Sequence, residues 1–128
     1  MKKLLSTSLI LFFALGVLAQ NSTAYATIDK NCNSQAATIK ITNGQSASGF
    51  VIETLIAGNN CHSGARFTQK GFVIKNSSGN LVFKYQVDSN GQIYTPNGQL
   101  SKLTLGAGIY YVYVDGGHGA ILQLKYNK

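Results

Sequence analysis

Apolar and polar residues alternate along several short stretches of this chain. In residues 80–87, for example, Leu81, Phe83, Tyr85 and Val87 fall on one face, and the positions between them include a lysine and a glutamine. A period of two is typical of a β-strand that is buried on one side. The same pattern predicts eight strands in all, over residues 37–42, 50–55, 71–75, 80–87, 92–94, 100–105, 109–114 and 120–126.

Turn-forming pairs such as Ser78-Gly79 and Asn90-Gly91 separate these stretches. Glycine and asparagine supply the positive φ that tight turns between strands need. Beyond residue 26, no stretch shows a convincing helical pattern. Because strands with one apolar face need a second sheet to cover it, the chain is expected to fold as an all-β, antiparallel two-sheet β-sandwich without a substantial helix.

The predicted strand 109–114 reads IYYVYV and carries three tyrosines. Alternation places Tyr110 toward the core together with the two valines. It places Tyr111 and Tyr113 on the opposite face, where a ligand could reach them. If they lie there, they either offer flat aromatic surfaces to a ligand or cover another sheet, an edge or a partner chain.

The glycine-rich segment 115–119 is predicted to be a turn that pairs strand 109–114 with strand 120–126. In strand 120–126 the alternation predicts that Leu122 and Leu124 face the core and that Lys125 lies on the solvent-exposed face.

The chain opens with the features of an export signal. Two lysines precede an apolar run over Leu9–Leu18, and Ala24-Tyr25-Ala26 fits the small-x-small cleavage pattern. These features predict a Sec-type signal peptide over residues 1–26 and a single mature domain over residues 27–128. The apolar run is shorter than the roughly 20 residues that a membrane span needs. We therefore expect an extracellular or periplasmic protein with no transmembrane segment in its mature part.

The formal net charge of the chain is +7. The predicted mature part keeps nine basic and four acidic residues, a net charge of +5. A basic surface attracts phosphate, lipid headgroups or acidic polysaccharide, but the same charge can serve solubility alone. A nucleic-acid partner is not expected, because the chain is exported and Arg66 is its sole arginine.

Cys32 and Cys61 are the two cysteines. In an exported protein such a pair predicts a disulfide. The alternative is a metal site shared with His62 and His118, but the spacing matches no zinc pattern.

The C-terminal half resembles bacterial pre-peptidase C-terminal domains, which are secreted, jelly-roll-like β-sandwich modules. The matching residues are Leu81, Leu105, Gly108, Tyr110, Val112, Val114, Leu122 and Leu124. The resemblance implies a jelly-roll-like sandwich and a non-catalytic accessory or binding role. That family has an aspartate-rich strand where this chain has Phe72–Asn76, which lacks acids, so the resemblance supplies no calcium ligands.

The chain has few of the residues that enzymes use for catalysis. The acids are Asp29, Glu53, Asp88 and Asp115, and two of them, Asp88 and Asp115, are predicted to lie in turns. No Gly-x-Ser-x-Gly motif is present, and a Cys-His nucleophile pair needs a thiol that the disulfide would consume. We therefore expect no catalytic residues, no metal and no cofactor.

The sequence favours a secreted binding module for an extracellular or surface ligand. A glycan is expected ahead of an anionic lipid headgroup or an acidic polysaccharide, with Tyr111, Tyr113, Lys84 and Lys125 as the binding residues. The alternative is a structural or interaction protein that assembles with or docks to a partner protein through strand 109–114, by β-augmentation at an exposed edge.

Overall fold

The computed structural model describes residues 21–61, 70–88, 90–93 and 99–128. Within them the backbone forms eight strands and one turn of 3-10 helix. The elements are β1 (Asn21–Ile28), β2 (Ser34–Gln35), β3 (Ala37–Ile41), β4 (Ser48–Ile56), β5 (Lys70–Asn76), β6 (Leu81–Val87), η1 (Leu100–Lys102), β7 (Gly108–Asp115) and β8 (Ile121–Asn127).

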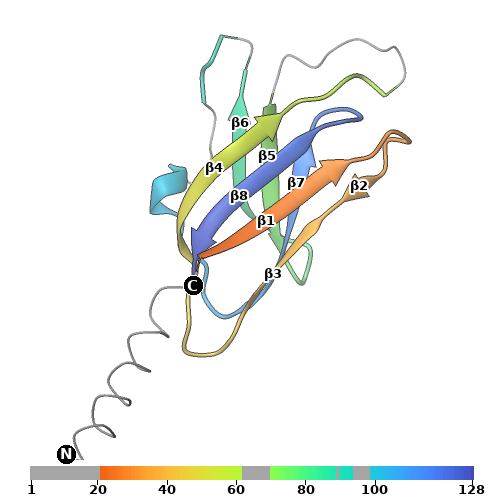
Figure 1. The fold of residues 1–128 in the computed structure, drawn as a ribbon. Helices are drawn as coiled ribbons and strands as arrows, with labels where there is room; N and C mark the ends of the chain where they lie inside the picture. Colours follow the sequence, from red (N-terminus) through yellow and green to blue (C-terminus); the bar gives the residue numbers. More distant parts are fainter. Residues whose placement is uncertain (1–20, 62–69, 89, 94–98) are drawn as a thin grey trace, which may run out of the picture.

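The strands form two four-stranded sheets that face each other (Figure 1). We call them sheet A, in the order β2-β1-β8-β4, and sheet B, in the order β3-β7-β5-β6. Every pairing between named strands is antiparallel. The predicted all-β, antiparallel two-sheet β-sandwich is therefore confirmed.

Alternation in the strands produces the core between the sheets. In β3, Ala37, Ile39 and Ile41 are buried, whereas Thr38 and Lys40 between them are exposed. Fully burying one large apolar side chain stabilises the fold by about 1.5–3 kcal/mol. The largest fully buried side chains come from both sheets and from the segment before β7: Phe72, Phe83, Ile39, Ile74, Leu105, Leu122, Leu124 and Val112.

Aromatic rings pack in pairs on the inner faces. In sheet B, Phe72 stacks on Tyr85 with ring centroids 5.4 Å apart and also contacts Phe83 at 6.2 Å. In sheet A, Phe50 stacks on Tyr126 at 5.3 Å. Tyr126 is 4% exposed and belongs to the core.

The predicted hairpin between β7 and β8 is wrong, because the two strands lie in different sheets. β7 pairs with β3 and β5, whereas β8 pairs with β1 and β4. The glycine-rich segment between them therefore crosses from sheet B to sheet A. It passes close to the end of β4: the Gly117 N–H donates to the Ala57 carbonyl at 2.9 Å. A Cβ on Gly58 would lie 2.6 Å from the backbone nitrogen of Ala120, so the crossing tolerates no side chain there.

Two of the predicted strands are not strands in the structure. In residues 100–105 the backbone turns into η1, and Leu105 forms an isolated bridge with Ala47. In residues 92–94, Ile93 bridges Val87, and Tyr94 lies outside the described residues. The apolar residues of segment 100–105 face the core all the same, because Leu100 and Leu103 pack against it without joining a sheet.

β1 begins inside the segment that the sequence assigns to the signal peptide. Asn21–Ala26 lies in β1 and pairs with β8 along its length. Ala24 and Ala26 are 3% and 0% exposed. The folded part of the described chain thus includes residues on the N-terminal side of the predicted boundary at Ala26, while processing itself stays a prediction.

The predicted disulfide between Cys32 and Cys61 is confirmed, with the two Cα atoms 5.8 Å apart. It joins the β1–β2 turn to the segment that follows β4. The two thiols are therefore consumed and do not serve as metal ligands. Among the residues that the structure describes, no helix is long and apolar enough to cross a membrane.

Three turns share one hydrogen-bond pattern, in which a side-chain oxygen accepts from the backbone N–H groups two and four residues later. Asp29, Asn76 and Asp88 supply that oxygen at distances of 2.8–3.0 Å. The residue three positions after each has a positive φ: Cys32, Gly79 and Gly91. Asp29 and Asp88 therefore stabilise turns, as predicted for Asp88.

Candidate functional site

Tyr111 and Tyr113 lie on the outer face of sheet B. Val112 and Val114 point inward with 0% and 4% of their surface exposed, and Tyr110 packs against the same core. Tyr111 and Tyr113 alternate with these residues and are half-buried rather than enclosed. The predicted division of the three tyrosines between the two faces of the strand is thus what the structure shows.

Neighbouring strands surround the two tyrosines with lysines. Tyr111 lies opposite Thr38 on β3 and opposite Lys75 on β5. Directly opposite residues on one face of a sheet have Cβ atoms about 4.5–5.5 Å apart, so these side chains are in contact range. The Lys75 ammonium also lies over the ring of Tyr113, 5.7 Å from its centroid.

The lysine cluster continues on both sides of β7. Tyr113 lies opposite Val73 on β5, and Val73 lies opposite Lys84 on β6. At the other end, Ile109 lies opposite Lys40 on β3. We call the outer surface formed by Lys40, Lys75, Lys84, Tyr111 and Tyr113 the tyrosine–lysine face.

One acidic residue, Asp115, shares this outer face, because it alternates along β7 with Tyr111 and Tyr113. Asp115 is exposed at the end of β7, opposite Gly71. Asp29 and Asp88 accept hydrogen bonds within turns, and Glu53 is exposed on β4 of sheet A. The tyrosine–lysine face therefore combines aromatic rings with an excess of positive charge, which suits an anionic ligand with flat surfaces.

The structure brings together three of the four residues that the sequence proposed. Lys84 shares the outer face of sheet B with Tyr111 and Tyr113. Lys125 lies on β8 in sheet A, where it pairs with Thr23 and Val51 on the outer face of the opposite sheet. Lys125 and the two tyrosines therefore lie on opposite outer faces of the sandwich and do not form one site.

Lys40 and Lys75 were not among the binding residues predicted from the sequence. Both lysines take outward positions, Lys40 on β3, which alternates clearly, and Lys75 on β5, directly after the apolar run Phe72–Ile74. Alternation could have shown that Lys40 lies outside the core, whereas the sequence of β5 has no such clear pattern. The nearness of both lysines to the tyrosines depends on β3 and β5 flanking β7, which alternation within single strands does not reveal.

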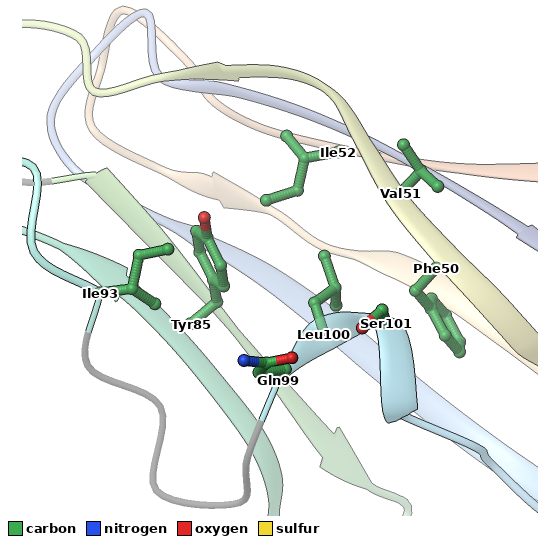
Figure 2. Close-up of a pocket in the computed structure, with 8 residues that line it drawn as sticks. All are labelled: Phe50, Val51, Ile52, Tyr85, Ile93, Gln99, Leu100 and Ser101. Carbon is green, nitrogen blue, oxygen red and sulfur yellow. The ribbon is translucent and has the colours of Figure 1, made fainter.

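A second feature is an apolar cleft of about 410 Å³ between β4, β6 and η1 (Figure 2). Sheet A ends at β4 and sheet B ends at β6, so the cleft lies where the sandwich is open at one side. Tyr85, Ile93 and Leu100 line one side and Ile52 the other, with Gln99 and Ser101 at the rim (Figure 2). Its volume suits a small molecule, and its described lining holds no charged side chain.

The described part of the chain contains no cluster of side chains that could bind a metal, and it includes one of the two histidines. No group of three or more histidine, cysteine, aspartate or glutamate side chains there is arranged to hold a metal ion. His118 is half-buried in the crossing segment, where its carbonyl accepts from the Asn59 N–H at 2.9 Å. His62 lies outside the described residues.

No protein-family model matches this chain, and the searches of curated proteins and of solved structures found no match either. The resemblance of the C-terminal half to pre-peptidase C-terminal domains therefore stays a prediction.

Proposed function

We propose that this chain is a secreted, non-catalytic binding module whose tyrosine–lysine face takes an acidic polysaccharide. The observation that carries the proposal is the position of the Lys75 ammonium, 5.7 Å from the ring centroid of Tyr113 and on a strand that flanks Tyr111. A polysaccharide with regularly spaced carboxylates offers both a charge for the lysines and sugar-ring faces for an aromatic side chain.

The two tyrosines have different roles in this proposal. The ring of Tyr113 holds the Lys75 ammonium through a cation–π interaction, which orients the charge. Tyr111 lies directly opposite Lys75 and supplies the ring on which a sugar stacks. Lys84 and Lys40 extend the positive surface to either side of these residues.

Assembly by β-augmentation at strand 109–114 receives no support from the topology. β7 lies inside sheet B, paired with β3 over residues 108–112 and with β5 over residues 110–115. A strand whose edges are both occupied has no free N–H and C=O groups for an added strand. The hypothesis that strand 109–114 is an exposed edge to which a partner strand adds is therefore wrong.

The proposal is tested by titrating the protein with polygalacturonate, a polyuronate, and with dextran, a neutral polysaccharide. We expect binding to the polyuronate and not to dextran. Tyr111→Ala should weaken binding by roughly three- to tenfold, the value of one aromatic contact. Tyr113→Leu should weaken it by roughly two- to fivefold, whereas Tyr113→Phe, which keeps the ring under Lys75, should bind like wild type.

Tyr25→Ala is the matched control. Tyr25 is 53% exposed on β1 of sheet A, so its loss removes a surface tyrosine from the other outer face. The proposal fails if wild type does not bind the polyuronate, or if Tyr25→Ala and Tyr111→Ala weaken binding equally. Binding to anionic phospholipid vesicles without binding to the polyuronate would assign the face to a lipid headgroup instead.

A further inference from the structure

β1 is an integral strand of sheet A. Seven of its residues, Asn21 to Thr27, are paired with Asn127 to Ile121 of β8. Ala24 and Ala26 point inward and are 3% and 0% exposed, and both belong to the hydrophobic core. Ser22 lies opposite Tyr126, and its side chain hydrogen-bonds the tyrosine.

Cleavage after Ala26 would remove most of this strand. Six of the seven paired positions between β1 and β8 would be lost, and β8 would become an edge of sheet A. The backbone N–H and C=O groups of β8 on that side would lose their partners, and Leu122 and Leu124 would lose the alanines beside them. A cut at this position therefore conflicts with the sandwich that the rest of the chain forms.

The Ala24-Tyr25-Ala26 pattern has an explanation within the fold. The two alanines are small because they face the core next to Leu124 and Leu122. Tyr25 between them is 53% exposed because it points outward. Strand alternation thus produces a small-x-small triplet without any role in cleavage.

A second triplet lies upstream of β1 in the sequence. Val17-Leu18-Ala19 ends the apolar run and is followed by Gln20, one residue before β1 begins. Ala19 supplies the small residue that leader peptidase requires before the cut. Cleavage at that position keeps the whole of β1.

We propose that leader peptidase cuts this chain between Ala19 and Gln20, so that the mature domain keeps β1 as its first strand. The proposal assumes that the chain is exported, as the proposed function does, but it does not depend on any ligand.

The test is to express the full chain with its own leader in a bacterial host and to determine the N-terminus of the exported protein by sequencing and intact mass. We expect Gln20 as the first residue. Ala19→Leu should block processing and leave the precursor, whereas Ala19→Ser, which keeps a small side chain, should be processed like wild type. A mature chain that begins at Thr27 or elsewhere overturns the proposal, as does normal processing of Ala19→Leu.

A comparison of the two purified chains gives an independent check. The chain of residues 27–128 should fail to fold or should melt roughly 10 °C or more below the chain of residues 20–128, because it lacks β1. Equal melting temperatures would overturn the proposal. An unprocessed wild-type chain that stays in the cytoplasm overturns both this proposal and the predicted export, whereas export with a Thr27 start overturns the cleavage site alone.

Discussion

The two outer faces of the sandwich follow the same alternation but present different chemistry. On sheet A, Thr54 of β4 donates a hydrogen bond to the Gln123 side chain of β8 at 2.8 Å. The lysine on this part of sheet A is Lys125, which lies between Thr23 and Val51. On sheet B, three lysines flank the two half-buried tyrosines of β7, and one of these lysines lies over an aromatic ring.

The difference between the two faces shows that a protein with a modest net charge can still gather its positive charge on one face. The chain carries a charge of +7 and no dense run of basic residues after its first residues. Three separate strands each contribute one lysine to the tyrosine–lysine face, so the cluster exists in space and not in the sequence. The two faces should therefore respond differently when they are altered: changes on the tyrosine–lysine face should weaken binding, and changes on the sheet A side should leave the affinity almost unchanged.

The largest effect is expected from the disulfide, which belongs to the sheet A side. Replacing both cysteines, as Cys32→Ser with Cys61→Ser, should lower the free energy of unfolding by about 3–4 kcal/mol, because the unfolded chain regains the freedom of a closed loop of about 30 residues. Urea denaturation measures this loss. Polyuronate affinity, measured below the melting temperature, should stay unchanged, and a tenfold loss of affinity would show that the two sides are coupled.

A matched variant sharpens the same experiment. Cys32 has a φ of 66°, a left-handed conformation that glycine adopts without strain. Cys32→Gly with Cys61→Ser should therefore be about 1 kcal/mol more stable than the double serine variant. If the glycine variant is less stable than the double serine variant, the turn does not keep this conformation without the disulfide.

The next largest effect is expected when lysines are removed from the tyrosine–lysine face rather than from the sheet A side. Lys75→Ala with Lys84→Ala removes two charges from the tyrosine–lysine face and should weaken polyuronate binding by about five- to tenfold at low salt. The matched control, Lys30→Ala with Lys125→Ala, removes the same charge from the sheet A side and should leave the affinity almost unchanged. Both variants should keep their stability within about 0.5 kcal/mol per substitution, since all four lysines lie at the surface or are half-buried.

The salt dependence of the affinity distinguishes binding at the tyrosine–lysine face from a general effect of net charge. The affinity gap between the two double variants should narrow as the salt concentration rises, because screening shortens the range of surface charges. Equal losses in both variants at low salt would mean that net charge alone drives binding, and the comparison between the faces would fail.

The sequence predicted the positions of the strands better than it predicted which strands pair with each other. Alternation within 109–114 and 120–126 identified β7 and β8 and the faces of their side chains, because burial depends on the local period of two. It did not predict that β7 and β8 lie in different sheets, since strand pairing depends on contacts far apart in the chain. β1 was missed because its alanines and its position after an apolar run are also typical of a signal peptide.

The candidate site shows the same limit. Tyr111 and Tyr113 could be assigned to the outer face from strand alternation alone. Lys84 was grouped with them correctly, but Lys125 was not, because both lysines alternate equally well and differ only in the sheet to which they belong. Lys40 and Lys75 became recognisable once β3 and β5 were known to flank β7.

The smallest effect concerns Tyr126, the inner tyrosine of sheet A. Burial raises the pKa of Tyr126 above its ordinary value of 10.0, and the hydrogen bond from Ser22 offsets part of that rise. Tyr126 is thus protonated in the folded protein at a pH where the unfolded chain has begun to lose that proton. The folded state then binds more protons, so this contribution to stability is complete below pH 10 and declines as the pH rises through the raised pKa.

Urea denaturation at several pH values between 8 and 11.5 measures this decline. Tyr126→Phe should lose stability less steeply than wild type above roughly pH 10, because phenylalanine releases no proton. Lysine titration contributes equally to both proteins and cancels in the difference. Identical curves for wild type and Tyr126→Phe would mean that Tyr126 ionises equally easily in the folded and unfolded states, and hence that the inner face of β8 is more open to water than the structure shows.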